Sequence, residues 1–483
     1  ESGRVLRAEF GWISDRNFLN EYYEREWDQD KDALTSFWLQ RNIGTRSSNL
    51  IAQFQINDFF TQTSWWPRYD HFIIGQPAFM NRAVWHGRST IGYAKMKAAT
   101  PPTQNIAQQP FYPLPWQGDV QGIRVGTRQE LDFPQQFGPV KVIPYILGDA
   151  TYWGKDLDDQ DFFRAFGQTG IKASLPFWKV DPTIQSTLWN INGLAHKVSF
   201  DVDAFYAKAS RDLDRLPLYD PINDDSQEAF ERRFAVNLFG FPPWPALAPT
   251  PAWPPKFDPR YYALRSGIQG NVSSPSPEIA GDLSTVQLGI RQRWQTKRGM
   301  PGEERIVDLI TFDLEYSLFP DADRDNFGSS IGMLNYDFRW HVGDRVSLLS
   351  DGYFDVFSKG LQTANFGMFA SRPAVGNVYI GFRTIKGPIN SNVLSSTVLY
   401  RMSEKWGIRG LSQVDFGDTG TIGQGLGLIY IGESFLWQLG VNYDASRNNL
   451  GFRFGFEPRF INRPRMFNPG GVPIGPAGSR WLE

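Results

Sequence analysis

The sequence predicts an all-β protein, and more specifically a large transmembrane antiparallel β-barrel of roughly 20 to 26 strands. Three observations predict it. Long stretches alternate apolar and polar residues, and 15% of the residues are aromatic, with 38 Phe, 18 Tyr and 17 Trp. In addition, no run approaches the roughly 18 consecutive apolar residues that a membrane-spanning helix needs, so strands would have to cross.

Alternation with a period of two is the main evidence for strands, because successive side chains of a strand point to opposite faces. Alternating stretches of this kind occur at 198–206, 286–295, 310–318 and 334–342. They run for roughly 10 to 14 residues, which suits a tilted membrane strand better than a soluble one. A soluble β-sandwich would alternate in the same way and is the alternative. In residues 334–342 the apolar members are Leu334, Tyr336, Phe338, Trp340 and Val342, and the polar members are Asn335, Asp337, Arg339 and His341.

The polar faces of these stretches carry full charges, which we interpret as the lining of an aqueous lumen. We expect Arg291 and Arg293 to face Asp313 and Glu315 across a hairpin as cross-strand ion pairs. The charged residues predicted to face the lumen are Arg291, Arg293, Asp313, Glu315, Asp337 and Arg339.

We expect one barrel over residues 1–461, with long loops near 14–33 and 209–260, and a Pro/Gly-rich tail at 462–483. In the second loop, acids precede bases from Asp224 onward, which predicts a short capped helix. A proline run follows it, and proline cannot donate to a sheet ladder. Either loop could fold into the lumen, cover its mouth or lie in solvent, and the sequence leaves these alternatives open.

The composition argues against a catalytic or metal centre. The chain has no cysteine and only 4 histidines, which removes thiol ligands and makes a histidine-built site hard to assemble. A formal net charge of −2 gives no electrostatic case for nucleic acid. We therefore expect no enzymatic activity, no cofactor and no metal ion.

Near its end, the chain carries a short pattern that is typical of a last barrel strand. Asn449, Gly451, Phe454 and Phe456 fit the order polar, glycine, apolar, apolar. This order resembles the signal read by the barrel-assembly machinery, which we expect as a partner during biogenesis. Phe454 and Phe456 would lie on one aromatic face, and Gly451 permits close approach of a neighbouring backbone.

Three segments, 14–26, 137–145 and 216–221, resemble the lipopolysaccharide-assembly translocon of the outer membrane, also called the organic solvent tolerance family. The likeness is to divergent members from planctomycete-type bacteria. It implies a barrel of up to about 26 strands in the outer membrane of a Gram-negative-type bacterium. It also implies a plug lipoprotein in the lumen, contact with outer-membrane lipid, and insertion of lipopolysaccharide into the outer leaflet.

The resemblance also implies a lateral gate between the first and last strands. Here the gate would place residues 4–12, including Phe10 and Gly11, against residues 451–460, where Pro458 removes one ladder donor. A diffusion porin or a structural outer-membrane barrel is the alternative function. A foreign subunit in the lumen would favour the translocon, whereas an infolded segment of the chain itself would favour the porin.

Overall fold

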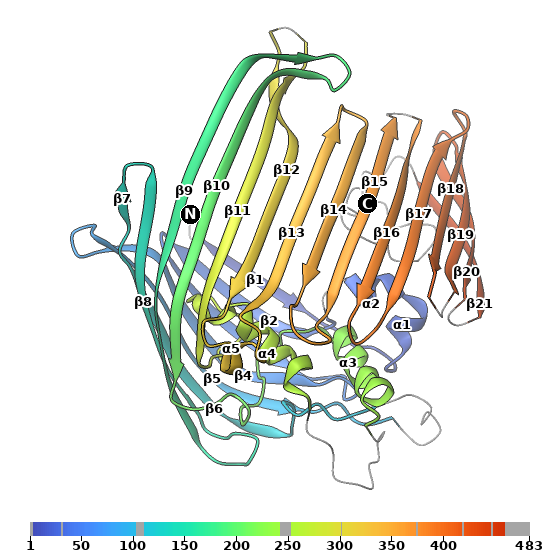
Figure 1. Cartoon of the computed structure of the whole chain (residues 1–483). Coiled ribbons are helices and arrows are strands. Elements are labelled where there is room, and N and C mark those ends of the chain that lie inside the picture. Colours follow the sequence, from blue (N-terminus) through green and yellow to red (C-terminus); the bar gives the residue numbers. More distant parts are fainter. Residues whose placement is uncertain are drawn as a thin grey trace. The chain divides into compact units, whose positions relative to one another are not determined.

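The structure, a computed structural model, describes residues 3–29, 32–102, 111–241, 253–300, 302–372, 375–417, 420–445 and 448–458. These residues form 21 strands that belong to one sheet (Figure 1). The pairings with a described register are all antiparallel, as between β12 (Arg305–Leu318) and β13 (Ile331–Val342). The predicted all-β class is confirmed, and the number of strands lies within the predicted range.

The remaining elements follow in chain order. The strands are β1 (Arg4–Glu9), β2 (Thr35–Ile43), β3 (Arg46–Phe54), β4 (Gln62–Ala78), β5 (Ala83–Lys97), β6 (Val120–Asp132), β7 (Gln135–Phe137), β8 (Val140–Trp153), β9 (Phe162–Ser186), β10 (Ile191–Ala209), β11 (Leu283–Arg298), β14 (Val346–Phe354), β15 (Gln362–Arg372), β16 (Gly376–Lys386), β17 (Ser391–Arg401), β18 (Trp406–Asp415), β19 (Gly420–Ile431), β20 (Phe435–Asp444) and β21 (Asn449–Pro458). The helices are α1 (Phe18–Tyr22), α2 (Glu24–Gln29), α3 (Asp225–Leu238), η2 (Pro255–Phe257), α4 (Pro259–Arg265), η3 (Ile268–Gly270) and α5 (Ala322–Asp325). Across the described residues, none of the helices combines the length and the apolar character needed to span a membrane.

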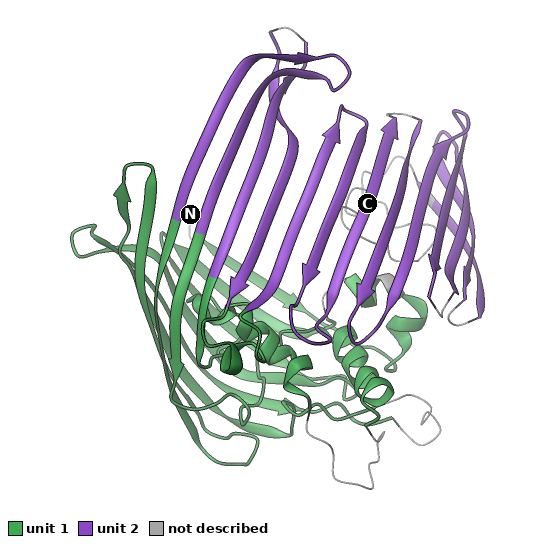
Figure 2. Ribbon diagram, viewed as in Figure 1, with its two compact units in different colours: residues 1–173, 202–286, 319–330 green, residues 174–201, 287–318, 331–483 purple. Residues whose placement is uncertain are grey.

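The chain divides into two compact units, which Figure 2 shows in different colours. The long strands β9, β10 and β11 contribute residues to both units. Unit 1 comprises residues 1–173, 202–286 and 319–330, and unit 2 comprises residues 174–201, 287–318 and 331–483.

The strands of unit 1 bury their charged face and expose their apolar face. On β6, Ile123 and Val125 are 48% and 41% exposed, whereas Arg124 between them is fully buried. β5 and β8 follow the same rule, with Ile91 and Ile146 about half exposed. A soluble sheet does the opposite, because burying charge is costly and exposing large apolar side chains gains nothing in water. This arrangement indicates that the outer face meets lipid rather than water.

The last strand of the described chain has an exposed aromatic face. β21 pairs in register with β20, and the ring of Phe456 packs against those of Phe435 and Trp437. Phe452 and Phe454 are both largely exposed. The predicted terminal strand is therefore present, and its aromatic side chains lie on one face as expected. The predicted tail at 462–483 and most of the proline run, at 242–252, lie outside the described residues.

The described residues 210–241 and 253–282, which we call the covering segment, form a compact layer in unit 1. The predicted helix is confirmed as α3: the side chain of its N-cap Asp224 accepts a hydrogen bond of 2.8 Å from the Gln227 amide. The core of the layer consists of Tyr112, Leu114, Trp116, Leu213, Leu218, Ala235, Phe241, Trp253, Ala263, Leu264 and Ile279. The covering segment is thus an ordered part of the fold rather than a solvated loop.

The insertion between β1 and β2 also packs onto unit 1. It contains α1 and α2, and Trp27 of α2 stacks on Phe60 with ring centroids 5.6 Å apart. Asp32 then accepts a hydrogen bond of 2.9 Å from the Asp225 amide at the start of α3. The two long insertions therefore contact each other.

Glycine is required opposite Tyr336 in unit 2. Tyr336 of β13 lies directly opposite Gly352 of β14, and a Cβ at Gly352 would meet its ring and lie 3.0 Å from the Thr363 carbonyl oxygen. We predict that Gly352→Val destabilises the fold by about 1–3 kcal/mol through overpacking. Gly148→Val on β8 is the control, because a Cβ there meets nothing within 4 Å. The measurement is the fraction of folded protein that keeps its compact electrophoretic mobility before heating, and equal fractions for the two variants would contradict the prediction.

Candidate functional site

A row of polar side chains crosses neighbouring strands on one face of unit 2. The register places Asp313 of β12 opposite Asp337 of β13, and Asp337 opposite Asp351 of β14. Asp351 in turn lies opposite Asn365 of β15, which faces Arg383 of β16. Directly opposed residues share a face of the sheet, so these five strands present one continuous polar surface.

Ion pairs neutralise part of this surface. Arg293 binds Asp313 through two hydrogen bonds of 2.6 and 2.8 Å. Arg339 binds Asp337 on its own strand, at 3.0 Å. One expectation was wrong: Arg291 pairs with Asp201 of β10 at 2.8 Å rather than with a carboxylate of β12. The reason is that β11 has a neighbour on each side, and Arg291 turns to the strand before it in the sequence.

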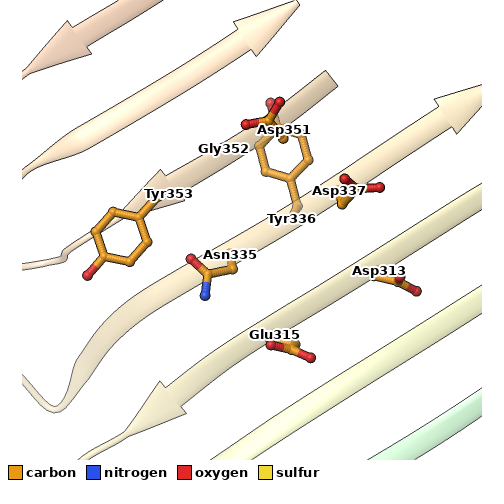
Figure 3. Close-up of a pocket in the computed structure, with 8 residues that line it drawn as sticks. All are labelled: Asp313, Glu315, Asn335, Tyr336, Asp337, Asp351, Gly352 and Tyr353. Atoms are coloured by element: carbon orange, nitrogen blue, oxygen red, sulfur yellow. The ribbon is translucent and has the colours of Figure 1, made fainter. Parts of the chain in front are cut away.

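A pocket of about 500 Å³ opens on this polar surface (Figure 3). Four carboxylates from three strands line it. Asp337 and Asp351 are directly opposed like charges, an unfavourable arrangement that their hydrogen bonds to Arg339 and Asn365 offset. The lining residues are Asp313, Glu315, Asn335, Tyr336, Asp337, Asp351, Gly352 and Tyr353. Such a lining suits water and small hydrophilic solutes.

Unit 1 carries a different polar face, built from five arginines on β4, β5, β6 and β9. The side chain of Arg124 is fully buried. Among the arginines of this face that form ion pairs, Arg68 has the most accessible side chain, and it is only 14% exposed. All five point to the face that the covering segment packs on. They are Arg68, Arg88, Arg124, Arg128 and Arg164, and we call them the arginine row.

Carboxylates of the covering segment bind the centre of the arginine row. Arg124 Nη1 lies 2.7 Å from both Asp220 Oδ2 and Glu278 Oε1, and Arg68 Nη1 lies 2.6 Å from Asp220 Oδ1. The guanidinium of Arg124 also lies over the ring of Trp65, 4.5 Å from its centroid. Charge-assisted hydrogen bonds away from water are the strongest available to a protein, so these contacts hold the segment in place.

Main-chain carbonyls of the covering segment bind the rest of the row. Arg88 Nη1 donates to the Ser274 carbonyl at 2.6 Å, and Arg128 Nη1 donates to the Asn271 carbonyl at 3.2 Å. Arg164 donates to the carbonyls of residues 277, 278 and 280. Residues 271–282 contain no helix and make only a few main-chain turn bonds among themselves, so several of their carbonyls can accept hydrogen bonds from donors outside the segment. The arginine row supplies them.

Asp220 remains ionised under this layer. Burial alone would raise the pKa of its carboxyl group, but the positive charges of Arg124, Arg68 and Arg88 outweigh burial and hold the pKa below its usual range. The ion pairs of Asp220 with Arg124 and Arg68 therefore persist down to strongly acidic pH.

The carboxylates of α3 behave in the opposite way. Burial raises the pKa of Glu228 to about 7, although Arg232 lies only 3.2 Å away. Burial, together with Glu228 and Asp258, raises the pKa of Glu231 to about 8. The carboxyl groups of Glu228 and Glu231 therefore change between the protonated and the ionised form near neutral pH, whereas Asp220 stays ionised.

The residues predicted to form a lateral gate lie on two separate elements. Asn449, Gly451, Phe454, Phe456 and Pro458 all belong to β21, where Pro458 lies opposite Phe435 at the end of the ladder. Phe10 and Gly11 directly follow β1. β1 belongs to unit 1 and β21 to unit 2, so a gate between them stays a prediction.

Sequence reasoning missed the arginine row, although a signal for it exists. Arg124 and Arg128 occupy the polar positions of an alternating stretch at 120–132, and Arg88 does so in the stretch before it. The sequence does not show which carboxylates pair with these arginines. Asp220 lies 96 positions beyond Arg124 and Glu278 lies 154 beyond it, distances over which no periodicity connects them.

Comparison with known proteins adds little to these contacts. No protein-family model matches the sequence, and no curated protein does. Similar solved structures include a triple mutant of the Rhodopseudomonas blastica porin and a structure described as "Asymmetric conductivity of engineered proteins". Each is 11% identical, covers 70% of this chain and 91% of its own chain, and has a TM-score of 0.24. Likeness at this score carries no weight for fold or function, so the proposals below rest on the chain's own contacts.

We predict that Arg124→Ala loosens the covering segment. The change leaves Glu278 buried without its partner guanidinium, and breaking a buried pair in this way costs about 3–5 kcal/mol. The control is Arg339→Ala, because its pair with Asp337 is about 40% exposed and such pairs contribute about 0–1 kcal/mol. Limited proteolysis of residues 210–282 is the measurement, and an Arg124→Ala protein as resistant as the control would refute the role of the ion pairs.

We predict that the docking of α3 weakens as the pH rises. The folded pKa values of Glu228 and Glu231, about 7 and 8, lie above the ordinary glutamate value of 4.5. Between about pH 4.5 and about pH 8, the undocked state therefore binds fewer protons than the docked state. The free energy that holds α3 in its docked position falls as the pH rises through this window and is greatest below it.

Hydrogen exchange of the α3 amides measures this effect. Glu228→Gln cannot ionise, so between about pH 5 and about pH 9 wild-type protection should fall about tenfold more than that of the variant. Comparing the two proteins at the same pH cancels the intrinsic rate. Identical pH profiles would show that Glu228 does not couple docking to pH.

Proposed function

We propose that the protein is an outer-membrane β-barrel that lets ions and small hydrophilic solutes diffuse across the membrane, with its own covering segment narrowing the passage. One observation carries the proposal. The strands of unit 1 expose apolar side chains on one face while burying full charges on the other, under a segment of the same chain.

The exposed apolar face supports a membrane location. A β-sandwich, the soluble alternative, would bury the apolar sides of its strands against a second sheet. Here Ile91, Ile123 and Ile146 are each about half exposed, and so are Leu439 and Phe454 in unit 2. Large contiguous apolar surface of this kind is unstable in water and stable in lipid.

The covering segment supports a porin-type rather than a translocon-type barrel. A translocon of the family that the sequence resembles would hold a separate plug lipoprotein in its lumen. In unit 1 the arginine row is already engaged by Asp220 and Glu278 of the chain itself, so this polar face is covered without a second subunit. Lipopolysaccharide insertion remains the competing proposal, and it would require a binding surface elsewhere.

The polar surface of unit 2 supports the passage of hydrophilic solutes. Its carboxylates Asp313, Glu315, Asp337 and Asp351 line a pocket that is open to solvent, and only part of their charge is neutralised by arginine. A wall that carries excess negative charge attracts cations. The passage should therefore prefer cations.

The test is the conductance of the purified protein in planar bilayers. We predict conductance without any added subunit and a reversal potential that shows cation preference. Asp351→Asn should lower the ratio of cation to anion permeability roughly twofold, because one of several screened charges is removed. Asp159→Asn, which removes an exposed carboxylate from the loop between β8 and β9, is the control.

A different set of results would contradict the diffusion barrel. A protein that does not conduct, that copurifies with a lipoprotein, and whose depletion removes surface lipopolysaccharide would establish the translocon instead. Mass spectrometry of the purified complex detects the lipoprotein and any bound lipid in one measurement.

A further inference from the structure

We propose that unit 1 binds a single monovalent anion of halide size, such as chloride, in a small cavity between the arginine row and the covering segment. The ligands are Arg88, Arg128 and Thr90. The anion would complete the charge balance beneath the covering segment, and the site does not depend on the transport proposed above.

The register creates the need for an anion. Arg88 of β5 lies directly opposite Arg128 of β6, so two like charges share one face of neighbouring strands. Both are buried, with 8% and 3% of their surface exposed. Directly opposed like charges are destabilising even at a sheet surface, and the interaction is stronger where water is excluded.

A cavity of about 10 Å³ lies between these two side chains and the covering segment. This volume corresponds to about one probe sphere, which is the space that a single water or halide ion needs. Pro277 lines it from the covering segment, and its other lining residues come from strands: Arg88, Thr90, Gly126, Thr127, Arg128, Asp149 and Thr151. Sulfate, phosphate and carboxylates are too large for it.

Three buried donors have no hydrogen-bond partner among the described residues. They are Arg88 Nε, Arg128 Nη2 and Thr90 Oγ1, and each belongs to a residue that lines the cavity. A guanidinium can only donate, so its unmet need is for an acceptor. An unsatisfied buried donor of this kind is costly, and three around one cavity indicate a missing acceptor.

The charges also call for an anion rather than a water molecule. Four arginines of the row pair with four carboxylates in the described part of unit 1, namely Asp70, Asp149, Asp220 and Glu278. Arg164 donates to main-chain carbonyls, so the row as a whole carries one positive charge more than these carboxylates balance. Arg88 is the least neutralised ion-pair member: its nearest carboxylate, Asp70, is 3.9 Å away and lies 2.9 Å from Arg68. Water would satisfy donors but not this charge.

Asp149 also lines the cavity, and its carboxylate would repel an anion if it were free. It is not free, because Oδ2 accepts a hydrogen bond of 3.1 Å from Arg128 Nε and Oδ1 accepts one of 2.9 Å from Thr151. The Asp149–Arg128 pair is therefore close to neutral, and Nη2 of Arg128, a residue that lines the cavity, remains without a hydrogen-bond partner.

Bromide is the direct probe, because it scatters anomalously and replaces chloride. Crystals of the full chain grown in bromide should show an anomalous peak in the cavity, within hydrogen-bonding distance of Arg88 Nε and Arg128 Nη2. Density that refines as water with no anomalous signal would overturn the proposal.

Thermal unfolding provides the solution test. Binding to the folded state multiplies the ratio of folded to unfolded protein by 1 + [anion]/Kd. The midpoint should therefore be higher in chloride than in isethionate, an anion too bulky for the cavity, at equal ionic strength. Equal midpoints in the two salts would overturn the proposal.

Two variants locate the effect. Arg88→Gln should abolish the difference between chloride and isethionate, and Thr90→Val, which keeps both guanidiniums, should reduce it. The matched control is Thr397→Val on β17 of unit 2, another buried threonine whose hydroxyl lacks a partner among the described residues. A chloride effect that persists in Arg88→Gln, or that Thr397→Val reduces as much as Thr90→Val does, would show that the anion binds elsewhere.

Discussion

The arginine row of unit 1 is the constraint on which the rest of this unit depends. Arg124 and its neighbours are full charges on strands whose opposite face is apolar and exposed. Such charges are stable away from water only when hydrogen-bonded and neutralised. The covering segment meets this requirement with two carboxylates and a series of main-chain carbonyls. Strands and segment therefore stabilise each other, and neither would keep its observed structure without the other.

The two units stabilise the charged residues of their polar faces in different ways. In unit 1 the polar face is covered by protein and nearly dry, so its charges are matched by specific partners. In unit 2 the polar face holds a solvent-open pocket with partly exposed ion pairs such as Arg339–Asp337. Water and counter-ions screen charges there, and the pairs contribute little to stability. The dry face thus suits a structural role, and the wet face suits contact with solutes.

This division bears on the choice between a conduit and a lipid translocon. A barrel too wide to be filled by its own wall side chains needs something to occupy part of its interior. In unit 1 the chain lays the covering segment over the polar face, and Trp253 of this segment packs with Trp116 in a shared core. A covering segment from the same chain fits the proposed diffusion barrel, which would need no second subunit.

Local pattern in the sequence determined the strands, the capped helix α3 and the terminal strand at Asn449–Pro458, because side-chain alternation and helix capping depend on residues a few positions apart. It also indicated which side chains share a polar face. The sequence could not show that Arg291 turns to Asp201, that Arg124 meets Asp220 and Glu278, or that the covering segment lies over the arginine row. Those contacts join positions about 90 to 190 residues apart. Only the register of the sheet and the return of the chain across it bring them together, and both are properties of the tertiary structure.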